Sequence, residues 1–418
     1  MVQWRDCRLG DLLEIRHGFA FLGEHFADAG THIVLTPGNF FDEGGFKHKG
    51  DKEKWYRGPV PSDYVLKEGD LIVAMTEQAE GLLGSSAIVP RSGLYLHNQR
   101  LGLVQIRDTM QIDKHFAYHL FNCKPVRQQI RGSASGTKVR HTAPARIADV
   151  RVSVPPHPIQ TRIAGILSAY DELIENCQRR IKILETMARA LYREWFVHFR
   201  FPGHESVPRV PSPLGEIPEG WEVKTLREVA VVNRAQISAR TAPEELHYID
   251  ISSVSPGQID STTTYTFAGA PGRARRIVQH GDVLWSCVRP NRRSYALVMH
   301  PERGTIASTG FAVLTATQVP FTFLYFATTT EDFVTHLANN ATGAAYPAVT
   351  AATFERADIL VPAAPILTKF GHATIPMVEE IRTLQRQIEN LRRTRDLVLP
   401  RLLSGQVDVA TMPESVNA

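Results

Sequence analysis

Residues 174–191 read IENCQRRIKILETMARAL, and residues 381–398 read IRTLQRQIENLRRTRDLV. At an offset of 207 positions the two stretches match in their apolar residues and in a shared Gln-Arg pair. The matched residues are Ile174, Cys177, Gln178, Arg179, Ile181, Leu184 and Leu191 in the first stretch, and Ile381, Leu384, Gln385, Arg386, Ile388, Leu391 and Val398 in the second. A repeat of this length indicates two copies of one structural unit.

The same offset continues upstream of these stretches. Ala134-Ser135-Gly136 corresponds to Ala341-Thr342-Gly343, Val154-Pro155 to Val361-Pro362, and Pro158-Ile159 to Pro365-Ile366. Nearer the start of each copy the offset grows, to 212 between Gly69-Asp70 and Gly281-Asp282 and to 217 between Trp4 and Trp221. We therefore expect a shared scaffold whose surface loops differ in length, and such loops commonly carry binding specificity.

Two kinds of segment alternate within each copy. The first is a mixed segment in which short strands, such as residues 70–74 and 282–285, are separated by Gly and Pro turns. The second kind lies at residues 160–200 and 368–404. Its apolar residues recur at spacings of three and four, which predicts an amphipathic helix of the coiled-coil type. Arg395 interrupts the second apolar seam at the position of Ala188, so we expect imperfect packing there.

These patterns predict an α/β fold, with two globular domains related by the repeat and two long helices. A segment rich in proline separates the copies and predicts an extended, semi-rigid connector. The predicted layout is a first globular domain at 1–155, a central helical spacer at 156–202, a proline-rich linker at 203–219, a second globular domain at 220–362, a second helical spacer at 363–405 and a tail at 406–418.

The composition is that of a globular protein, with 43% hydrophobic and 22% charged residues. No run approaches the roughly 18 apolar residues of a membrane span. Asp6 and Arg8 lie where a signal peptide would have its apolar stretch, so we expect a cytoplasmic protein without a membrane partner. The net charge of +4 permits a polyanionic partner without requiring one. No close pair that would indicate a zinc knuckle or a disulfide framework is found among Cys7, Cys123, Cys177 and Cys287.

Two similar domains joined by helical rods suit a split site on double-stranded DNA. Successive major-groove faces recur about every 34 Å, or about 10 base pairs, and a helix of about 28 residues spans about 42 Å. Because the globular segments differ in sequence while the helical segments match, we expect two unlike half-sites at a fixed separation. The expected target is therefore asymmetric and bipartite.

Basic and polar clusters on turn-rich segments are the candidate DNA contacts. Arginine suits guanine edges and asparagine suits adenine edges, whereas phosphate contacts position a protein without reading sequence. For each basic residue a solvated surface role is the alternative, and a partly buried core position is the alternative for the tyrosine. The candidates are Lys138 and Arg140 in the first domain, Arg289, Asn291, Arg292 and Arg293 in the second, Arg273, Arg275 and Arg276 as phosphate contacts, and Tyr346 as a residue that stacks on or touches a base.

Several segments resemble the specificity subunits of type I restriction-modification systems. The run LYREWFVHF at 191–199, followed by Phe201-Pro202-Gly203, resembles the end of their central region, and LLSGQV at 402–407 resembles their carboxyl-terminal signature. The start containing Trp4 and the run LGEIPEGW at 214–221 are similar too. The resemblance covers nearly the whole chain, and the order of the pieces is more specific than any single one.

One departure from the family pattern concerns the start and cap of the second helix. Family members commonly have a glutamine after the proline-rich entry to the helix. Gln160 is that residue in the first copy, and the second copy has Leu367 in its place.

The resemblance implies two target-recognition domains joined by antiparallel helices. It also implies that two modification subunits dock on the chain and methylate adenine with S-adenosylmethionine. It further implies that motor-nuclease subunits, which use ATP and magnesium, join for restriction, and it implies no cofactor for the chain itself. Trp195 and Phe196 are candidate contacts to a modification subunit, with packing between the two helices as the alternative.

The sequence favours a recognition subunit without a catalytic centre of its own. Gly132 to Lys138 lacks the spacing of a phosphate-binding loop. His115 and His119 have the spacing of a helical metal pair but lack the glutamate that the zinc-protease pattern requires, so no metal site is expected. Glu222-Val223-Lys224 resembles the acid-x-lysine element of some nucleases, yet no suitably spaced upstream acid stands out, and we expect an ordinary strand.

Two other functional classes stay open at this point. One is a stand-alone, pseudo-twofold DNA-binding regulator or scaffold without methyltransferase partners. The other is an enzyme with a cryptic site, such as a nuclease. Magnesium-dependent cutting by the isolated chain, lost on changing Glu222 or Lys224, would identify the latter.

Overall fold

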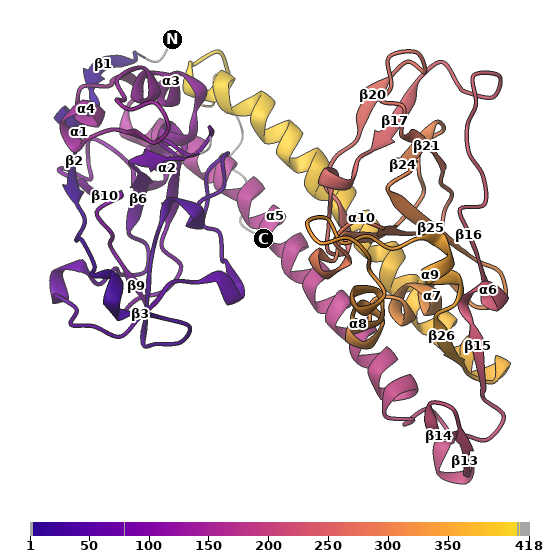
Figure 1. Ribbon diagram of the computed structural model, residues 1–418. Coiled ribbons are helices and arrows are strands. Elements are labelled where there is room, and N and C mark those ends of the chain that lie inside the picture. The colour runs from indigo at the N-terminus through magenta and orange to yellow at the C-terminus, as the bar shows by residue number, and fades with distance from the viewer. Residues whose placement is uncertain (1–2, 79, 408, 410–418) are drawn as a thin grey trace. The chain divides into compact units, whose positions relative to one another are not determined.

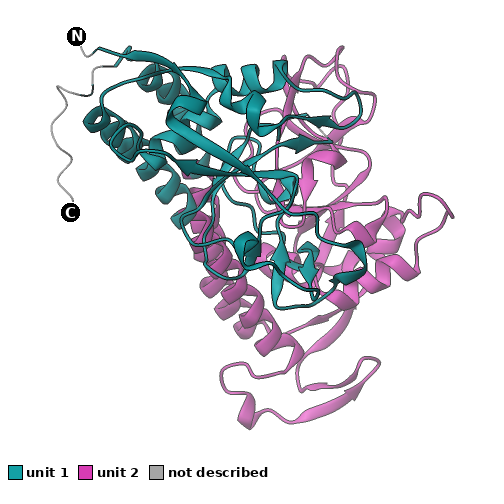
Figure 2. Cartoon of the chain, turned by 90° about the vertical axis from the view of Figure 1, so that its left-hand side faces the viewer, with its two compact units in different colours: residues 1–176, 388–418 teal, residues 177–387 magenta. Residues whose placement is uncertain are grey.

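The computed structural model describes residues 3–78, 80–407 and 409. The chain divides into two compact units, residues 1–176 with 388–418 (unit 1) and residues 177–387 (unit 2), coloured separately in Figure 2. Both units share the two long helices α5 (His157–Tyr192) and α10 (Ala364–Leu403), which are labelled in Figure 1. The two helices predicted from the repeat are thus confirmed.

The described residues of unit 1 form two four-stranded sheets and four short α-helices beside their parts of α5 and α10. One sheet has the strand order β2-β10-β6-β8 and is antiparallel, and the other has the order β3-β5-β4-β9, with β4 parallel to β9. Two-stranded pairs β1-β12 and β7-β11 complete the unit. The elements are β1 (Arg5–Arg8), α1 (Leu9–Leu12), β2 (Leu13–His17), β3 (Phe26–Ala27), β4 (His32–Val34), β5 (Trp55–Tyr56), β6 (Leu71–Ala74), β7 (Thr76–Glu77), β8 (Ser86–Ile88), β9 (Tyr95–Leu96), β10 (Leu101–Ile106), α2 (Lys114–Asn122), α3 (Lys124–Gly132), β11 (Arg140–His141), α4 (Pro144–Ala148) and β12 (Arg151–Val154).

Unit 2 repeats this plan. Its antiparallel sheet has the order β16-β25-β22-β23, and its mixed sheet has the order β20-β17-β24-β21, with β17 parallel to β24. The elements are β13 (Arg209–Ser212), β14 (Gly215–Pro218), β15 (Glu222–Thr225), α6 (Leu226–Val229), β16 (Ala230–Val232), β17 (Leu246–Ile249), β18 (Val254–Ser255), β19 (Gln258–Ile259), β20 (Thr263–Tyr265), β21 (Ala274–Ile277), β22 (Val283–Ser286), β23 (Tyr295–Leu297), β24 (Thr305–Ser308), β25 (Phe311–Ala316), α7 (Phe321–Ala327), α8 (Glu331–Asn339), α9 (Ala351–Glu355) and β26 (Asp358–Val361).

The two copies match element by element at the offset that the sequence gives. Helices α3, α4 and α5 and strand β12 each begin 207 positions before α8, α9, α10 and β26. Strands β6 and β22 are buried on both faces, which explains their continuous apolar runs. The predicted repeat of an α/β domain followed by a long helix is therefore confirmed.

The mixed sheets differ in their fourth strand. In unit 1 the fourth strand, β3, pairs with β5 at one edge of the sheet. In unit 2 it is β21, which pairs with β24 at the opposite edge. The variable part of the scaffold is therefore the mixed sheet, in agreement with the drift of the offset near the start of each copy.

The long helices run antiparallel within each unit. In unit 1 the Arg395 Nη1 of α10 lies 2.7 Å from the Asp171 Oδ1 of α5. In unit 2 the Arg180 Nη2 of α5 lies 2.5 Å from the Glu380 Oε1 of α10. At this position, where we expected imperfect packing, the Arg395 side chain is 11% exposed and forms an ion pair across the helices, so a charged contact replaces the apolar one.

The two helices begin in the same register although Gln160 is replaced by Leu367. The Gln160 side chain accepts a hydrogen bond from the Asp113 N–H at 2.9 Å and donates to the carbonyls of Gln111 and Pro155. The residue 207 positions after Asp113 is Pro320, which has no N–H to donate. Because the second copy has no N–H at this place, the apolar Leu367, 6% exposed, can replace the glutamine without leaving a backbone donor unpaired.

The family signatures at the two helix ends pack against the tryptophan that begins each copy. In unit 1 a Cβ on Gly405 would lie 2.7 Å from the Trp4 Nε1, so the indole rests directly on this glycine. In unit 2 the Trp221 ring, 5% exposed, packs against Phe199 and Phe201 beyond the end of α5. Each signature thus closes the core at the start of a domain.

The proline-rich connector differs from the extended form that we expected. Strands β13 and β14 pair as an antiparallel hairpin. Gly215 at its turn has a φ of +94°, and the Ser212 hydroxyl donates to the Gly215 carbonyl at 2.6 Å. The prolines favour extended backbone, and the Gly215 turn folds that backbone onto itself.

Candidate nucleic-acid interface

In unit 2 the candidate residues gather on the connection between β22 and β23. This segment, residues 287–294, contains a short 3₁₀ turn at Pro290–Arg292. Arg289 and Arg293, on either side of the turn, have left-handed backbone with φ of 50° and 58°. Non-glycine residues rarely adopt this conformation, and it clusters at functional sites because surrounding contacts must hold it. We call residues 289–293 the arginine loop.

A hairpin from a distant part of the chain packs beside the arginine loop. The Arg289 N–H donates to the Pro347 carbonyl at 2.7 Å, and its guanidinium donates to the Ala345 carbonyl at 3.0 Å. The same guanidinium lies 4.4 Å from the centroid of the Tyr346 ring. Tyr346 is 68% exposed, so the core position considered as an alternative is wrong. Arg289 and Tyr346 form one stacked surface, which suits contact with a base.

The side chains of the arginine loop differ in how they are held. Arg293 forms two contacts with the Glu331 carboxylate of α8, at 2.7 and 2.5 Å, which raises the pKa of Arg293 and braces the loop. Asn291 and Arg292 are exposed, and within the described residues no hydrogen bond or ion pair holds their side chains. They are therefore the residues of this loop that remain free to contact a ligand.

Unit 1 has the same hairpin with other residues. Ser135 and His141 exchange backbone hydrogen bonds of 3.0 and 2.9 Å, as Thr342 and Ala348 do in unit 2. Gly136 has a φ of +97°, and a Cβ there would lie 2.1 Å from the Val139 carbonyl oxygen, so the turn requires glycine. Lys138 is exposed near the tip of this hairpin. Arg140 is half-buried and donates to the Arg131 carbonyl at 3.2 Å.

The counterpart of the arginine loop in unit 1 was missed from the sequence. The strand pairing of Glu77 with Arg140 in unit 1 corresponds to the contact of Arg289 with Pro347 in unit 2. Glu77 and Arg289 are also 212 positions apart, the offset that separates Gly69 from Gly281. The Glu77 carboxylate, 2% exposed, accepts hydrogen bonds from the backbone N–H groups of Gly81 and Leu83. Extending this offset by eight residues would have pointed to the segment. We call residues 77–83 the acidic loop.

The acidic loop is braced from α3. Arg131 lies 2.9 Å from the Glu80 carboxylate, and Arg127 donates to the carbonyls of Leu83 and Gly81. The exposed side chains it offers include Gln78 and Glu80. In unit 1 basic side chains brace an acidic loop, whereas in unit 2 an acidic side chain braces a basic loop. The two copies thus present unlike chemistry at one position of the scaffold.

The three candidate phosphate contacts lie on or next to β21. The Arg273 guanidinium contacts the Asp250 carboxylate at 2.7 Å and the Tyr248 hydroxyl at 3.1 Å, and its side chain is 61% exposed. Arg275 lies 4.7 Å from the centroid of the Phe267 ring. Arg276 is half-buried, with a buried Nε that has no partner among the described residues. The structure groups these residues on the mixed sheet, away from the arginine loop in sequence, and their role stays a prediction.

The two candidate partner contacts belong to the core of unit 2. Phe196 is 6% exposed, and its ring packs against Trp221, Phe323 and Phe370. For Phe196 these contacts agree with the alternative of packing between α5 and α10. Trp195 is half-buried and packs against Phe196 and Phe370. Contact of Trp195 with another subunit stays a prediction.

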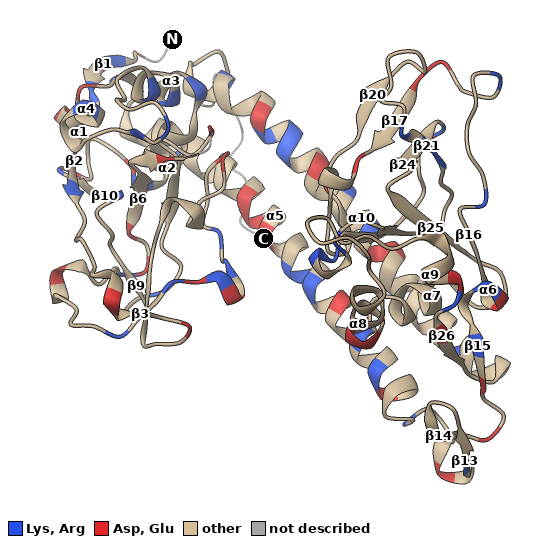
Figure 3. Cartoon of the chain, in the orientation of Figure 1, with Lys and Arg blue, Asp and Glu red and all other residues tan. Residues whose placement is uncertain are grey.

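The enzyme-like elements of the sequence take ordinary structural positions. Glu222–Thr225 forms strand β15, as predicted, and the Glu222 and Lys224 side chains pair with one another at 2.6 Å. His115 is exposed, whereas His119 is buried, so the two imidazoles do not form a site together. Basic and acidic residues both occur along α5 and α10 (Figure 3). Among the helices of the described residues, none combines the length and the apolar character that crossing a membrane requires.

Comparison with known proteins identifies the scaffold. Residues 1–186 match a family model described as the type I restriction modification DNA specificity domain. The MjaIX specificity subunit of Methanocaldococcus jannaschii, a type I restriction enzyme subunit, is 23% identical over 303 residues, covering 70% of this chain and 69% of that protein. The HindI specificity subunit of Haemophilus influenzae is 21% identical over 345 residues, covering 67% of this chain and 74% of that protein.

A solved structure shares the fold. The crystal structure of a type I restriction-modification S subunit from M. genitalium superposes with a TM-score of 0.61 at 15% identity, and the match covers 96% of each chain. Residues 1–186 are thus a DNA specificity domain of the type I restriction-modification class. Over 70% of its length the chain is similar to a specificity subunit of a type I restriction enzyme, in agreement with the resemblance of its sequence motifs.

Proposed function

We propose that the chain reads an asymmetric, bipartite site in double-stranded DNA, with one half-site for each globular domain. The observation that carries this proposal is the unlike chemistry of equivalent loops. The arginine loop and Tyr346 offer guanidinium, amide and aromatic groups, which suit guanine and adenine edges. The acidic loop with Lys138 offers amide, carboxylate and ammonium groups, and carboxylates suit the cytosine amino group. Two half-sites of different sequence follow from this difference.

The proposal assigns catalysis to partner subunits. The chain would be the non-catalytic member of a complex with methyltransferase subunits, which use S-adenosylmethionine, and with motor-nuclease subunits, which use ATP and magnesium. The relatives are named as specificity subunits of restriction enzymes, which supports such partners and not a stand-alone regulator or scaffold. Trp195 remains the candidate contact to a methyltransferase subunit. Location in the cytoplasm stays a prediction.

Replacing Arg292 with alanine is expected to relax one half-site. A bidentate contact to a base is worth about 1–3 kcal/mol of discrimination, so preference at one or two positions should fall by roughly tenfold to a hundredfold. The measurement is methylation-site mapping of DNA modified by the complex that contains the variant. Arg227→Ala, an exposed arginine on α6, is the matched control and should leave the recognised sequence unchanged.

The pattern of loss distinguishes reading from positioning. If Arg292→Ala weakens binding to all sequences equally and reduces its salt dependence, Arg292 contacts phosphate and the base-reading role is wrong. If the wild-type chain, mixed with its modification subunit, retains no DNA in a sequence-dependent way at moderate salt, the proposed function itself is wrong.

A further inference from the structure

Two histidines and a glutamate of unit 2 converge on one point outside the candidate DNA interface. His280 lies in the turn before β22, His300 lies in the turn after β23, and Glu379 lies on α10. One ligand atom from each of the three lies within 4.8 Å of the other two. The histidines are 20 positions apart, and His300 and Glu379 are 79 positions apart, so no closely spaced pair in the sequence indicates this cluster.

The contacts within this cluster match the donor set of a transition metal. The His300 Nε2 lies 2.7 and 3.0 Å from the two Glu379 carboxylate oxygens, and the His280 Nε2 lies 3.9 Å from Oε1. Ligands placed 2.0–2.1 Å from a tetrahedral zinc ion are separated by roughly 3.3 Å. The observed separations lie on both sides of this value, so small side-chain rotations would bring the three donors to a common ion.

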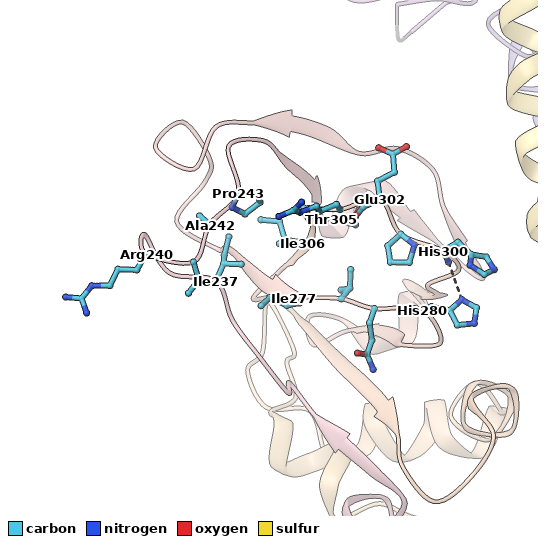
Figure 4. Close-up of a pocket in the computed structure, with 16 residues that line it drawn as sticks. Ile237, Arg240, Ala242, Pro243, Ile277, His280, His300, Glu302, Thr305 and Ile306 are labelled. Atoms are coloured by element: carbon cyan, nitrogen blue, oxygen red, sulfur yellow. Dashed lines mark hydrogen bonds between the residues drawn. The ribbon is translucent and has the colours of Figure 1, made fainter.

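The backbone holds His300 in a costly conformation that brings the imidazoles together. His300 has a φ of 47°, in the left-handed region that non-glycine residues rarely adopt. From there its N–H lies 3.3 Å from the His280 Nδ1, the dashed line in Figure 4, and the two ring centroids are 4.3 Å apart. Strain of this kind persists where surrounding structure holds it, and it is found at ligand sites.

An ion can reach the cluster from solvent. The side chains of His280, His300 and Glu379 are 38%, 58% and 37% exposed. Both histidines also line a cavity of about 760 Å³, with Ile277 and Ile306 on its wall (Figure 4). Three protein ligands and an open position on the solvent side leave room for a water or a small ligand to complete a four-coordinate zinc site.

The first copy does not repeat this cluster. The offset of 212 relates His280 to Glu68, and the offset of 207 relates Glu379 to Glu172. The shared scaffold therefore does not require the two histidines at this place. They lie at the base of the β22-β23 hairpin, whose opposite end carries the arginine loop.

We propose that His280, His300 and Glu379 bind one divalent transition-metal ion, with zinc as the expected ion. Each imidazole binds through Nε2 and carries its proton on Nδ1, so the long contact between the His300 N–H and the His280 Nδ1 is given up on binding. The ion ties both ends of the β22-β23 hairpin to α10 within unit 2. Binding of the metal does not depend on the proposed DNA recognition.

Titration of the metal-free, untagged chain with zinc chloride tests this site. Calorimetry should find one ion per chain, and cobalt chloride should give the visible absorption of a tetrahedral Co²⁺ complex. His300→Ala and Glu379→Gln should each weaken zinc binding by about a hundredfold, since each removes one of three protein ligands. Zinc should also raise the midpoint of thermal unfolding of the wild type and not of these variants.

A second histidine-glutamate pair in the same unit provides the control. His204 lies 3.5 Å from the Glu205 carboxylate, and its replacement by alanine should leave zinc binding unchanged. Equal affinity and stoichiometry in the wild type and in His300→Ala, or binding to the wild type that is too weak to measure at millimolar zinc, would overturn the proposal. Circular dichroism of each variant checks that the fold is retained.

Discussion

Replacing Arg395 with alanine is expected to lower the free energy of unfolding of unit 1 by up to about 3 kcal/mol, because it leaves the half-buried Asp171 carboxylate, 27% exposed, without its charged partner. Burial already raises the pKa of Asp171 although Arg395 opposes this effect. Without Arg395, the ionised Asp171 carboxylate would therefore destabilise the folded state. Urea unfolding combined with hydrogen exchange of peptides from unit 1 measures the loss. Peptides from the cores of unit 2 should keep their protection against hydrogen exchange.

The repeat supplies the matched control for this prediction. Val378 and Ala188 occupy the positions that correspond to Asp171 and Arg395, and both are buried and apolar. The double variant Asp171→Val with Arg395→Met should therefore regain most of the lost stability, since an apolar pair of similar volume replaces both charges. A residual cost is expected from the Tyr118 hydroxyl, which now donates to Asp171 at 3.4 Å. A double variant as unstable as Arg395→Ala would show that the ion pair is not the source of the loss.

Unit 1 is expected to lose stability as the pH falls below about 6.5. Burial lowers the pKa of His119 to about 3 and that of His97 to about 4, both from an ordinary value of 6.5. Between these values the unfolded chain binds protons that the folded chain does not, so the folded state is favoured less at lower pH. Each histidine contributes about 1.4 kcal/mol per pH unit in this window, or about 2 kcal/mol between pH 6.5 and pH 5.

The residue of unit 2 that corresponds to His119 suggests a substitution that tests the pH dependence of stability. Phe326 stands at the position that corresponds to His119 and is 4% exposed. His119→Phe should therefore retain the fold, and its unfolding free energy should change about half as steeply with pH, leaving the contribution of His97. The measured quantity is the slope of that free energy between pH 5 and pH 6.5, which a uniform packing defect would not alter. An unchanged slope in His119→Phe would show that His119 is not the group that titrates.

The repeat made the scaffold predictable from the sequence. The offset of 207 holds across elements that pack in the core, namely α3, α4, β12 and α5 in the first copy. An insertion in any of them would turn apolar residues out of the core, so these elements keep the same spacing in both copies. The residue types beside the turns also made DNA contacts predictable: arginine and asparagine suit base edges, which pointed to Arg289, Asn291 and Arg292. The structure adds that a cation–π contact joins Arg289 to Tyr346.

Other features depend on contacts between distant residues, which periodicity does not reveal. Arg395 breaks the apolar seam when α10 is considered alone, and its partner Asp171 lies 224 positions earlier. Phe196 was a candidate contact to a modification subunit, yet rings from three other segments cover it. The acidic loop contains no basic residue, so positive charge in the sequence does not mark it as a DNA contact. Each of these cases was decided by a partner that only the fold brings near.

The division of α10 between the units has a consequence for the order of folding during synthesis. Unit 2 is continuous in sequence, from residue 177 to 387, and can form as soon as those residues have left the ribosome. Unit 1 must wait for residues 388–407, which supply Arg395 to Asp171 and Gly405 to Trp4. The domain that is made first is therefore the domain that is finished last, and a nascent chain stalled before residue 388 would leave Trp4 without its covering turn.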